Sequence, residues 1–198
     1  MSDMPRGRPL QFDPDRARQA AMHLFWAHGY QGTSLRDLTR EMALSRSSFY
    51  QSMGNKEQLF IDCLGDYRRN LLNRLSQRME AAPSARAFLE DLFMEAADSA
   101  GSEQARLGCL IFNSAAELGH DDGHAAEQAR GSLRQLTGLL QSCVERAQSR
   151  GEIPPDRDTK ALAHYLTASM AGLRTLVKSS VGRRTARATA RQMLAALQ

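Results

Sequence analysis

The segment from residue 124 to residue 150 carries an apolar seam whose spacing is that of a helix. Its apolar residues step along the chain by four and three: Ala129, Leu133, Leu136, Leu140, Cys143 and Ala147. Side chains at this spacing share one helix face, which must be buried against other helices. No segment alternates apolar and polar residues as a half-buried strand does. The sequence therefore predicts an all-α fold.

The composition fits helices and indicates where a charged partner would bind. Hydrophobic residues make up 42% of the chain and aromatic residues only 6%, and much of the apolar content is Ala and Leu, which are good helix formers. The net charge of +4 suits a polyanionic partner. Residues 84–128 are acidic, whereas both ends of the chain are basic. We therefore expect a nucleic-acid-binding face to be confined to an end of the chain.

Several protein classes are disfavoured by what the sequence lacks. No apolar run is long enough to span a bilayer, and no apolar signal segment follows the first methionine. We therefore expect a cytoplasmic protein that makes no membrane contact. Cys63, Cys109 and Cys143 are an odd number of cysteines in helical patterns, which predicts reduced thiols and no disulfide framework.

The sequence also lacks the motifs of enzymes and metal sites. It has no nucleophile elbow, phosphate-binding glycine loop or paired-histidine motif, so we expect neither catalysis nor a cofactor. Residues 120–124 gather two histidines and two aspartates. Because zinc sites normally draw ligands from more than one segment, we interpret this stretch as an interhelical turn without a metal.

Four N-capping residues divide the first 83 residues into four helices: Asp13, Ser34, Ser45 and Asn55. Pro14 opens the first helix, and Gly29 is expected to end it. Asp37 completes a capping box for the second. The third is short and ends near Gln51. Pro83 stops the fourth, which is expected to join two domains.

Beyond Ser84 the chain is predicted to continue as helices alone, which gives about nine helices in total. The expected helices cover residues 84–100, 104–118, 124–150, 158–179 and 184–197. Glycine and proline separate them at Gly101, Gly119, Gly151 and Pro154.

Two short capped helices joined by a tight turn and braced by a third can place one helix in the major groove of DNA. The inserted helix must bury one side and present hydrogen-bonding groups on the other. The segment after Ser45 offers such a polar face, made of Arg46, Ser47, Ser48, Tyr50 and Gln51. Phe49 and Leu44 are expected to point inward. A trihelical bundle without a nucleic-acid role is the structural alternative.

The same region resembles the amino-terminal signature of the TetR family of transcriptional regulators. The resemblance covers about residues 10–64 and is carried by residues 25–30, 33–38, 44–50 and 55–60. It implies a helix-turn-helix DNA-binding domain with a basic arm at residues 1–64. It also implies a larger helical effector-binding and dimerisation domain at residues 65–198.

The chain departs from the family pattern at two positions. Ala43 stands in the turn where glycine is usual, and Met53 stands where an aromatic residue is usual near the end of the recognition helix. An alanine in a left-handed conformation costs about 1–2 kcal/mol. We therefore expect Ala43 either to bear this cost or to bend the turn differently.

The resemblance assigns the recognition helix residue by residue. Arg46, Ser47 and Ser48 occupy base-facing positions, and Arg46 is able to donate two hydrogen bonds to a guanine edge. Tyr50 and Gln51 occupy positions that touch phosphate or reach bases further along.

The remaining implied DNA contacts are to the backbone and the minor groove. Lys56, Thr33 and Ser34 lie at helix starts where phosphates are held. Arg6 and Arg8 belong to a flexible basic arm that enters the adjacent minor groove. The alternative for the arm is a solvated tail.

The implied function is repression of transcription at a pseudo-palindromic operator, with release by a small-molecule inducer. Activation remains open. A homodimer through the last two helices would present two recognition helices. Two apolar stripes are compatible with this pairing: Leu162, Leu166, Leu173 and Val177, followed by Ala186, Ala190, Met193, Leu194 and Leu197. The alternative is that they close the core of a single chain.

Seven residues are candidates for lining a mostly apolar effector pocket: Phe88, Leu92, Cys109, Phe112, Asn113, Cys143 and Met170. Each is also a typical core residue. Two alternatives to an inducer stay open. Cys109, with Arg106 three residues before it, would sense oxidants or electrophiles through its thiol, as some family members do. The protein would otherwise bind DNA constitutively, without a ligand.

Overall fold

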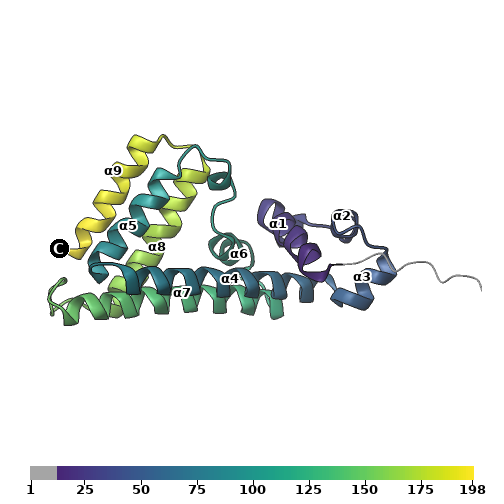
Figure 1. Cartoon of the computed structure of the whole chain (residues 1–198), viewed down its shortest axis with the longest axis horizontal. Helices are drawn as coiled ribbons and strands as arrows, with labels where there is room; N and C mark the ends of the chain where they lie inside the picture. The colour runs from purple at the N-terminus through teal and green to yellow at the C-terminus, as the bar shows by residue number, and fades with distance from the viewer. Residues whose placement is uncertain (1–12) are drawn as a thin grey trace, which may run out of the picture. The chain divides into compact units, whose positions relative to one another are not determined.

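The computed structural model describes residues 13–198, and within them helices are the only regular structure. The α-helices are, in order, α1 (Pro14–Gly32), α2 (Leu35–Glu41), α3 (Arg46–Met53), α4 (Lys56–Ala81), α5 (Ala85–Asp98), α6 (Leu110–Leu118), α7 (His124–Ser149), α8 (Thr159–Lys178) and α9 (Arg183–Leu194). Two 3-10 helices, η1 (Gln104–Arg106) and η2 (Ala195–Leu197), complete the order (Figure 1). The predicted all-α class is confirmed.

The chain forms two compact units, Met1–Cys63 and Leu64–Gln198, and α4 begins in the first and continues in the second. In the first unit the predicted caps are present. Ser34 and Asp37 form a reciprocal capping box at α2. The side-chain oxygen of Ser45 accepts a hydrogen bond from the Ser48 N–H at 3.1 Å. These local bonds fix where each short helix begins.

The core of the first unit is aromatic and aliphatic. Its fully buried members include Phe25, Leu38, Phe49, Leu59 and Phe60. The rings of Phe25 and Phe60 meet edge-on with their centroids 5.2 Å apart. Each of the four helices contributes to this cluster, which holds the helix-turn-helix as one packed unit.

Two backbone conformations shape the first unit. Gly29 has a φ of 77°, so the helical path of α1 breaks there, as expected, before a last turn reaches Gly32. Ala43, in the turn between α2 and α3, has a φ of 53°. Alanine therefore takes the left-handed conformation that glycine adopts more easily.

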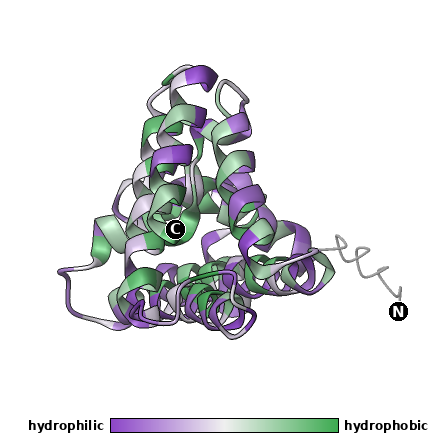
Figure 2. Cartoon of the chain, turned by 90° about the vertical axis from the view of Figure 1, so that its left-hand side faces the viewer, coloured by the Kyte–Doolittle hydropathy of each residue, from purple (hydrophilic) through white to green (hydrophobic). Residues whose placement is uncertain are grey.

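In the second unit, α5, α8 and α9 pack side by side, and α7 packs against α5, α6 and α8 (Figure 1). Hydrophobic and hydrophilic residues are both present on these helices, as amphipathic packing requires (Figure 2). None of the helices within residues 13–198 is both long and apolar enough to cross a lipid bilayer.

The prediction of one helix over residues 104–118 is wrong. The segment forms η1, then a turn, then α6 with Cys109 as its N-cap. Gly108 has a φ of 72°, which a continuous helix excludes. The side-chain N–H of Asn113 donates to the carbonyl oxygen of Leu107 at 2.8 Å and closes the turn.

The apolar stripe predicted on α8 is used inside the chain, because Leu162, Leu166, Leu173 and Val177 are all buried in it. Most of the α9 stripe is buried as well, and only Met193 is half-buried. A different stripe of α8 stays exposed at steps of four and three, made of Ala161, Tyr165, Ala168, Gly172 and Leu176. We call this second stripe the α8 outer stripe.

Candidate nucleic-acid interface

Helix α3 separates a buried side from a polar side. Phe49 and Met53 are buried in the first unit. Ser47 and Gln51 are exposed on the opposite side, Arg46 is exposed in the first turn, and Tyr50 is 54% exposed. Met53 therefore fills a core position, which explains how the chain dispenses with the usual aromatic residue there. The helix presents a hydrogen-bonding surface that no part of the described unit covers.

The amino-terminal turn of α3 concentrates donors. The hydroxyl oxygen of Ser45 lies 3.0 Å from that of Ser47 and 2.8 Å from that of Ser48. Ser48 itself is half-buried. Arg46 forms no ion pair within residues 13–198, so its planar guanidinium can direct its N–H donors outward.

Two further predicted residues lie at helix starts in the same unit. Lys56 opens α4, and its ammonium nitrogen lies 4.4 Å from the centroid of the Tyr30 ring. Burial and then the charge of Glu57 raise the pKa of Tyr30. Ser34 is exposed at the start of α2, and its hydroxyl donates to the Asp37 carboxylate at 2.5 Å. That bond, together with the Ser34 N–H, lowers the pKa of Asp37.

Thr33 does not offer the group that a phosphate contact requires. Its side chain is only 1% exposed. Its hydroxyl donates to the carbonyl oxygen of Gly29 at 2.6 Å, and its N–H donates to the carbonyl oxygen of Tyr30. Thr33 therefore fixes the turn between α1 and α2, and its buried side chain is not exposed to a phosphate. Arg6 and Arg8 lie outside the described residues.

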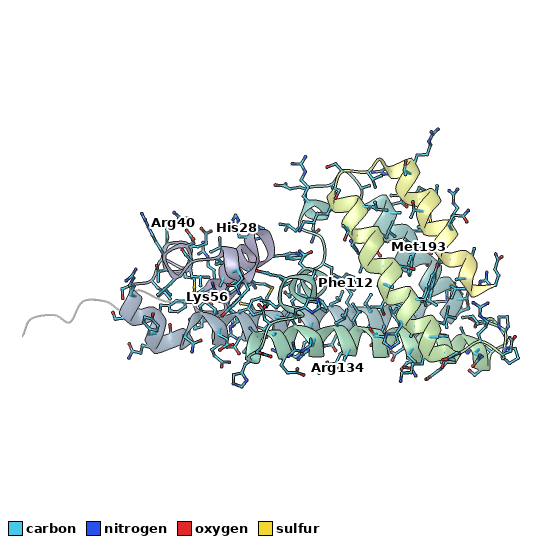
Figure 3. All side chains as sticks on the ribbon, turned by 180° about the vertical axis from the view of Figure 1, so that it is seen from behind. His28, Arg40, Lys56, Phe112, Arg134 and Met193 are labelled. Carbon is cyan, nitrogen blue, oxygen red and sulfur yellow. The ribbon has the colours of Figure 1, made fainter. Side chains whose placement is uncertain are left out.

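Two cations of α2 were missed by the sequence reasoning. Arg36 and Arg40 are exposed and stand four residues apart, so they share one side of the helix. Arg40 pairs with Asp37 at 3.1 Å. Figure 3 labels Arg40 on α2 and Lys56 at the start of α4. The signal was available in the sequence as two arginines at helical spacing beside the capped turn.

The seven effector candidates are distributed over four helices of the second unit. Five of them are buried: Phe88, Leu92, Cys109, Cys143 and Met170. Phe112, labelled in Figure 3, and Asn113 are half-buried on α6. A surface pocket of about 380 Å³ in this unit is lined by none of the seven. Their assignment to a ligand site stays a prediction.

All three thiols have hydrogen-bond partners, and the thiol of Cys63 donates to the carbonyl oxygen of Arg18 at 3.5 Å. The Tyr67 O–H donates to the sulfur of Cys109 at 3.6 Å, and burial, followed by the Cys109 contact, raises the pKa of Tyr67. The Cys143 thiol donates to the carbonyl oxygen of Ala85 at 3.4 Å. Burial raises the pKa of the Cys143 thiol to about 12. Arg106 is exposed on η1.

No group of three or more His, Cys, Asp or Glu side chains within residues 13–198 is placed to hold a metal ion. His120 and His124 are both exposed beside the turn that precedes α7.

Comparison with known proteins gives concordant results over both units. The family model described as bacterial regulatory proteins, tetR family, matches residues 18–63. The model described as tetracyclin repressor-like, C-terminal domain, matches residues 83–194.

Individual relatives and solved structures match most of the chain. The chain is 34% identical over 173 residues to the HTH-type transcriptional repressor ComR of Escherichia coli strain K12, a match that covers 85% of this chain and 80% of ComR. It is 31% identical over 173 residues to the HTH-type transcriptional regulator YezE of Bacillus subtilis strain 168, covering 87% and 89%. A cysteine mutant of the TetR family regulator CifR, solved with 26-base-pair operator DNA, matches with a TM-score of 0.83 and 28% identity, over 97% of this chain and 100% of CifR.

Proposed function

The chain belongs to the TetR family of bacterial DNA-binding transcriptional regulators, and from this premise we propose that it is a cytoplasmic repressor that a small-molecule inducer releases from a pseudo-palindromic operator. The observation that carries the proposal is the exposed polar side of α3, opposite the buried Phe49. The similarity to the repressor ComR and to the regulator CifR, solved with operator DNA, supports it.

Within this proposal, α3 enters the major groove and Arg46 identifies a base. An arginine in this setting donates two hydrogen bonds to guanine, worth about 1–3 kcal/mol of discrimination. The groove close to α3 is contacted by Ser47, Ser48 and Gln51. The longer side chain of Tyr50 reaches further along the groove. Exposure of four of these five side chains is compatible with such contacts.

Phosphate contacts position the helix without reading sequence. We assign them to Lys56 and Ser34, at the starts of α4 and α2, where the positive ends of helix dipoles favour anions. Arg36 and Arg40 add positive charge beside them. The pairing of Arg40 with Asp37 is exposed, so the cost of exchanging it for a phosphate is small.

We assign the dimer contact to the α8 outer stripe. Tyr165 and Leu176 are 41% and 40% exposed there, and a Cβ added at Gly172 would meet nothing within 4 Å. Large apolar side chains flanking small residues let a second helix approach closely, as in a four-helix bundle. Such a pair of chains would present two recognition helices to two half-sites.

Release by an inducer requires that the inducer bind two states of the protein unequally. The state that it prefers must hold the two recognition helices at a spacing that no longer matches the operator. Linkage then requires that operator DNA weaken inducer binding by the same factor.

A thiol-sensing alternative is favoured by one contact, the hydrogen bond from the Tyr67 O–H to the Cys109 sulfur. An electrophile that alkylates Cys109 would break this bond and add bulk at the start of α6. The test is the site-resolved alkylation rate of Cys109. A rate no faster than that of a free peptide thiol at neutral pH would rule this sensing mechanism out.

The proposed repressor function is tested by footprinting the purified protein on DNA flanking its own gene, with and without candidate inducers. We expect a two-fold symmetric footprint that an inducer abolishes. Replacing Arg46 by alanine should reduce the difference in binding affinity between the operator and operators with altered bases. The control is Arg150→Ala, because Arg150 is an exposed arginine of the second unit, and this variant should keep the difference in affinity unchanged. A protected site that no inducer releases would favour constitutive binding, and no protected site would contradict the proposal.

A further inference from the structure

A pocket of about 380 Å³ lies between α5 and α9, which pack against each other in the second unit (Figure 1). Its volume falls within the range of small-molecule sites, about 300–1,000 Å³. Its lining combines charged, polar and apolar groups: Arg86, Glu90 and Met94 come from α5, Arg191 and Leu194 from α9, and Ala195 and Gln198 from η2 and the residue after it. A lining of this kind recognises a ligand that is itself part charged and part apolar.

The first of its two arginines is held in place. The Nε of Arg86 donates to the carboxylate of Glu90 at 3.0 Å, and its Nη1 donates to the carbonyl oxygen of Glu152 at 3.4 Å. The backbone N–H of Arg86 donates to the Glu152 carboxylate at 2.9 Å. These bonds use only part of the donor set of the guanidinium. Arg86 is therefore a fixed cation with N–H groups to spare at the pocket.

The second arginine leaves a positive charge uncompensated. Arg187, one turn earlier on α9, is neutralised by Asp98, with its Nη1 at 2.6 and 2.8 Å from the two carboxylate oxygens. Arg191 forms no ion pair within the part of the chain that the structure describes. Because Glu90 offsets Arg86, the charged side chains at the pocket sum to one positive charge. The electrostatic complement is a single anionic group.

The apolar part of the lining favours a hydrocarbon tail. Met94 is half-buried, and Leu194 is buried against the core. Methionine adapts its shape to irregular apolar ligands. Burying a tail against this surface contributes about 25 cal/mol per Å².

We propose that the pocket between α5 and α9 binds a small organic anion with one carboxylate and an apolar tail. The carboxylate pairs with Arg191 and the donors that remain on Arg86, and the tail covers Met94 and Leu194. The site is distinct from the predicted effector residues, none of which lines it. On α9 the pocket is lined by Arg191 and Leu194. Met193 does not line it, and its carbonyl oxygen accepts a hydrogen bond from the Tyr165 O–H of α8 at 3.2 Å.

Calorimetric titration of the full chain with decanoate, in the absence of DNA, tests the proposal independently of the proposed function. We expect saturable binding of decanoate, with decanol, the uncharged analogue, binding more weakly. Replacing Arg191 by methionine keeps the aliphatic stem and removes the charge, and should weaken decanoate binding about fivefold to tenfold.

The matched control is Arg184→Ala, because Arg184 is an exposed arginine of α9 that does not line the pocket. This variant should bind decanoate as the wild type does. Thermal unfolding establishes that both variants are folded, which is expected because both arginines are exposed. The proposal is overturned if decanoate does not bind saturably, or if Arg191→Met binds it as tightly as the wild type.

Discussion

The ammonium nitrogen of Lys56 lies 4.4 Å from the centroid of the Tyr30 ring, which itself packs 4.9 Å from the ring of Phe60. The buried aromatic cluster thus orients the cation that we assign to a DNA phosphate. Replacing Lys56 by alanine should weaken binding to operator and unrelated DNA by the same factor. It should also reduce the slope of log K against log salt by about one, because one fewer phosphate is neutralised. Binding measured across a salt series checks both effects.

The orienting role of Tyr30 is tested separately from the charge. Tyr30→Leu removes the ring face, and a cation–π contact of this kind is worth about 0.5–1 kcal/mol, so we expect a twofold to fivefold loss of operator affinity. Tyr30→Phe keeps the ring and should restore the affinity. In the Lys56→Ala background, Tyr30→Leu should have no further effect on DNA affinity. If the two substitutions reduced operator affinity by independent factors, Tyr30 would act by a route that does not involve Lys56.

Ala43 adopts a φ of 53° in the turn between α2 and α3. Glycine relieves a left-handed cost of about 1–2 kcal/mol but adds conformational entropy to the unfolded chain worth about 0.4–1 kcal/mol. The variant Ala43→Gly should therefore raise the free energy of unfolding by about 0.5–1 kcal/mol, measured by denaturant titration. The control is Ala20→Gly, in the middle of the helical stretch of α1 that precedes Gly29, which should destabilise the protein by about 1 kcal/mol. Equal destabilisation by both changes would contradict the account.

The start of each short helix was predictable because its determinants are neighbours in the sequence. Ser34 and Asp37 exchange hydrogen bonds three residues apart, and the side-chain oxygen of Ser45 accepts from the Ser48 N–H at the same spacing. Because both partners of such a bond lie within one helical turn, residue types and spacing are sufficient to predict it. The polar side of α3 follows from the same logic, because Phe49 is the apolar side chain that was expected to anchor the helix in the core, and it is buried.

Features that depend on how the helices pack were not predictable in this way. Thr33 precedes the start of α2, a place where phosphates often bind. Packing nevertheless buries its side chain, and its hydroxyl donates to the carbonyl oxygen of Gly29. On α8, Leu166 faces the chain's own core, whereas Tyr165 beside it remains exposed. The 3.6-residue period identifies a stripe but does not reveal which of two apolar stripes the monomer uses. Only the placement of neighbouring helices decides between them.

The α8 outer stripe leads to a prediction about assembly. Replacing Ala168, at its centre, by glutamate would place two carboxylates close to the two-fold axis of the proposed dimer, where like charges repel and lose solvation. We expect the variant to shift from dimer to monomer in sedimentation equilibrium. Because Ala168 is exposed in the single chain, its helical content should be unchanged.

The matched control for this change is Ala116→Glu, which makes the same substitution at an exposed position of α6. This variant should sediment as the wild type does. If Ala168→Glu also remains dimeric, the dimer contact lies elsewhere on the chain. Loss of operator affinity in Ala168→Glu, with Arg46 and Lys56 intact, is expected because a monomer presents only one recognition helix.

The Cys143 thiol should alkylate far more slowly than a free peptide thiol. Burial raises the pKa of this thiol to about 12, so at about pH 8 its thiolate fraction is roughly a thousandfold lower than that of an ordinary thiol. Mass-spectrometric mapping of iodoacetamide labelling gives its rate in the native chain. Folding favours the protonated thiol, so its stabilising contribution is complete below about pH 9 and is lost as the pH rises through about 12. Labelling of native Cys143 as fast as in urea-unfolded protein would refute the assignment of a buried, protonated thiol.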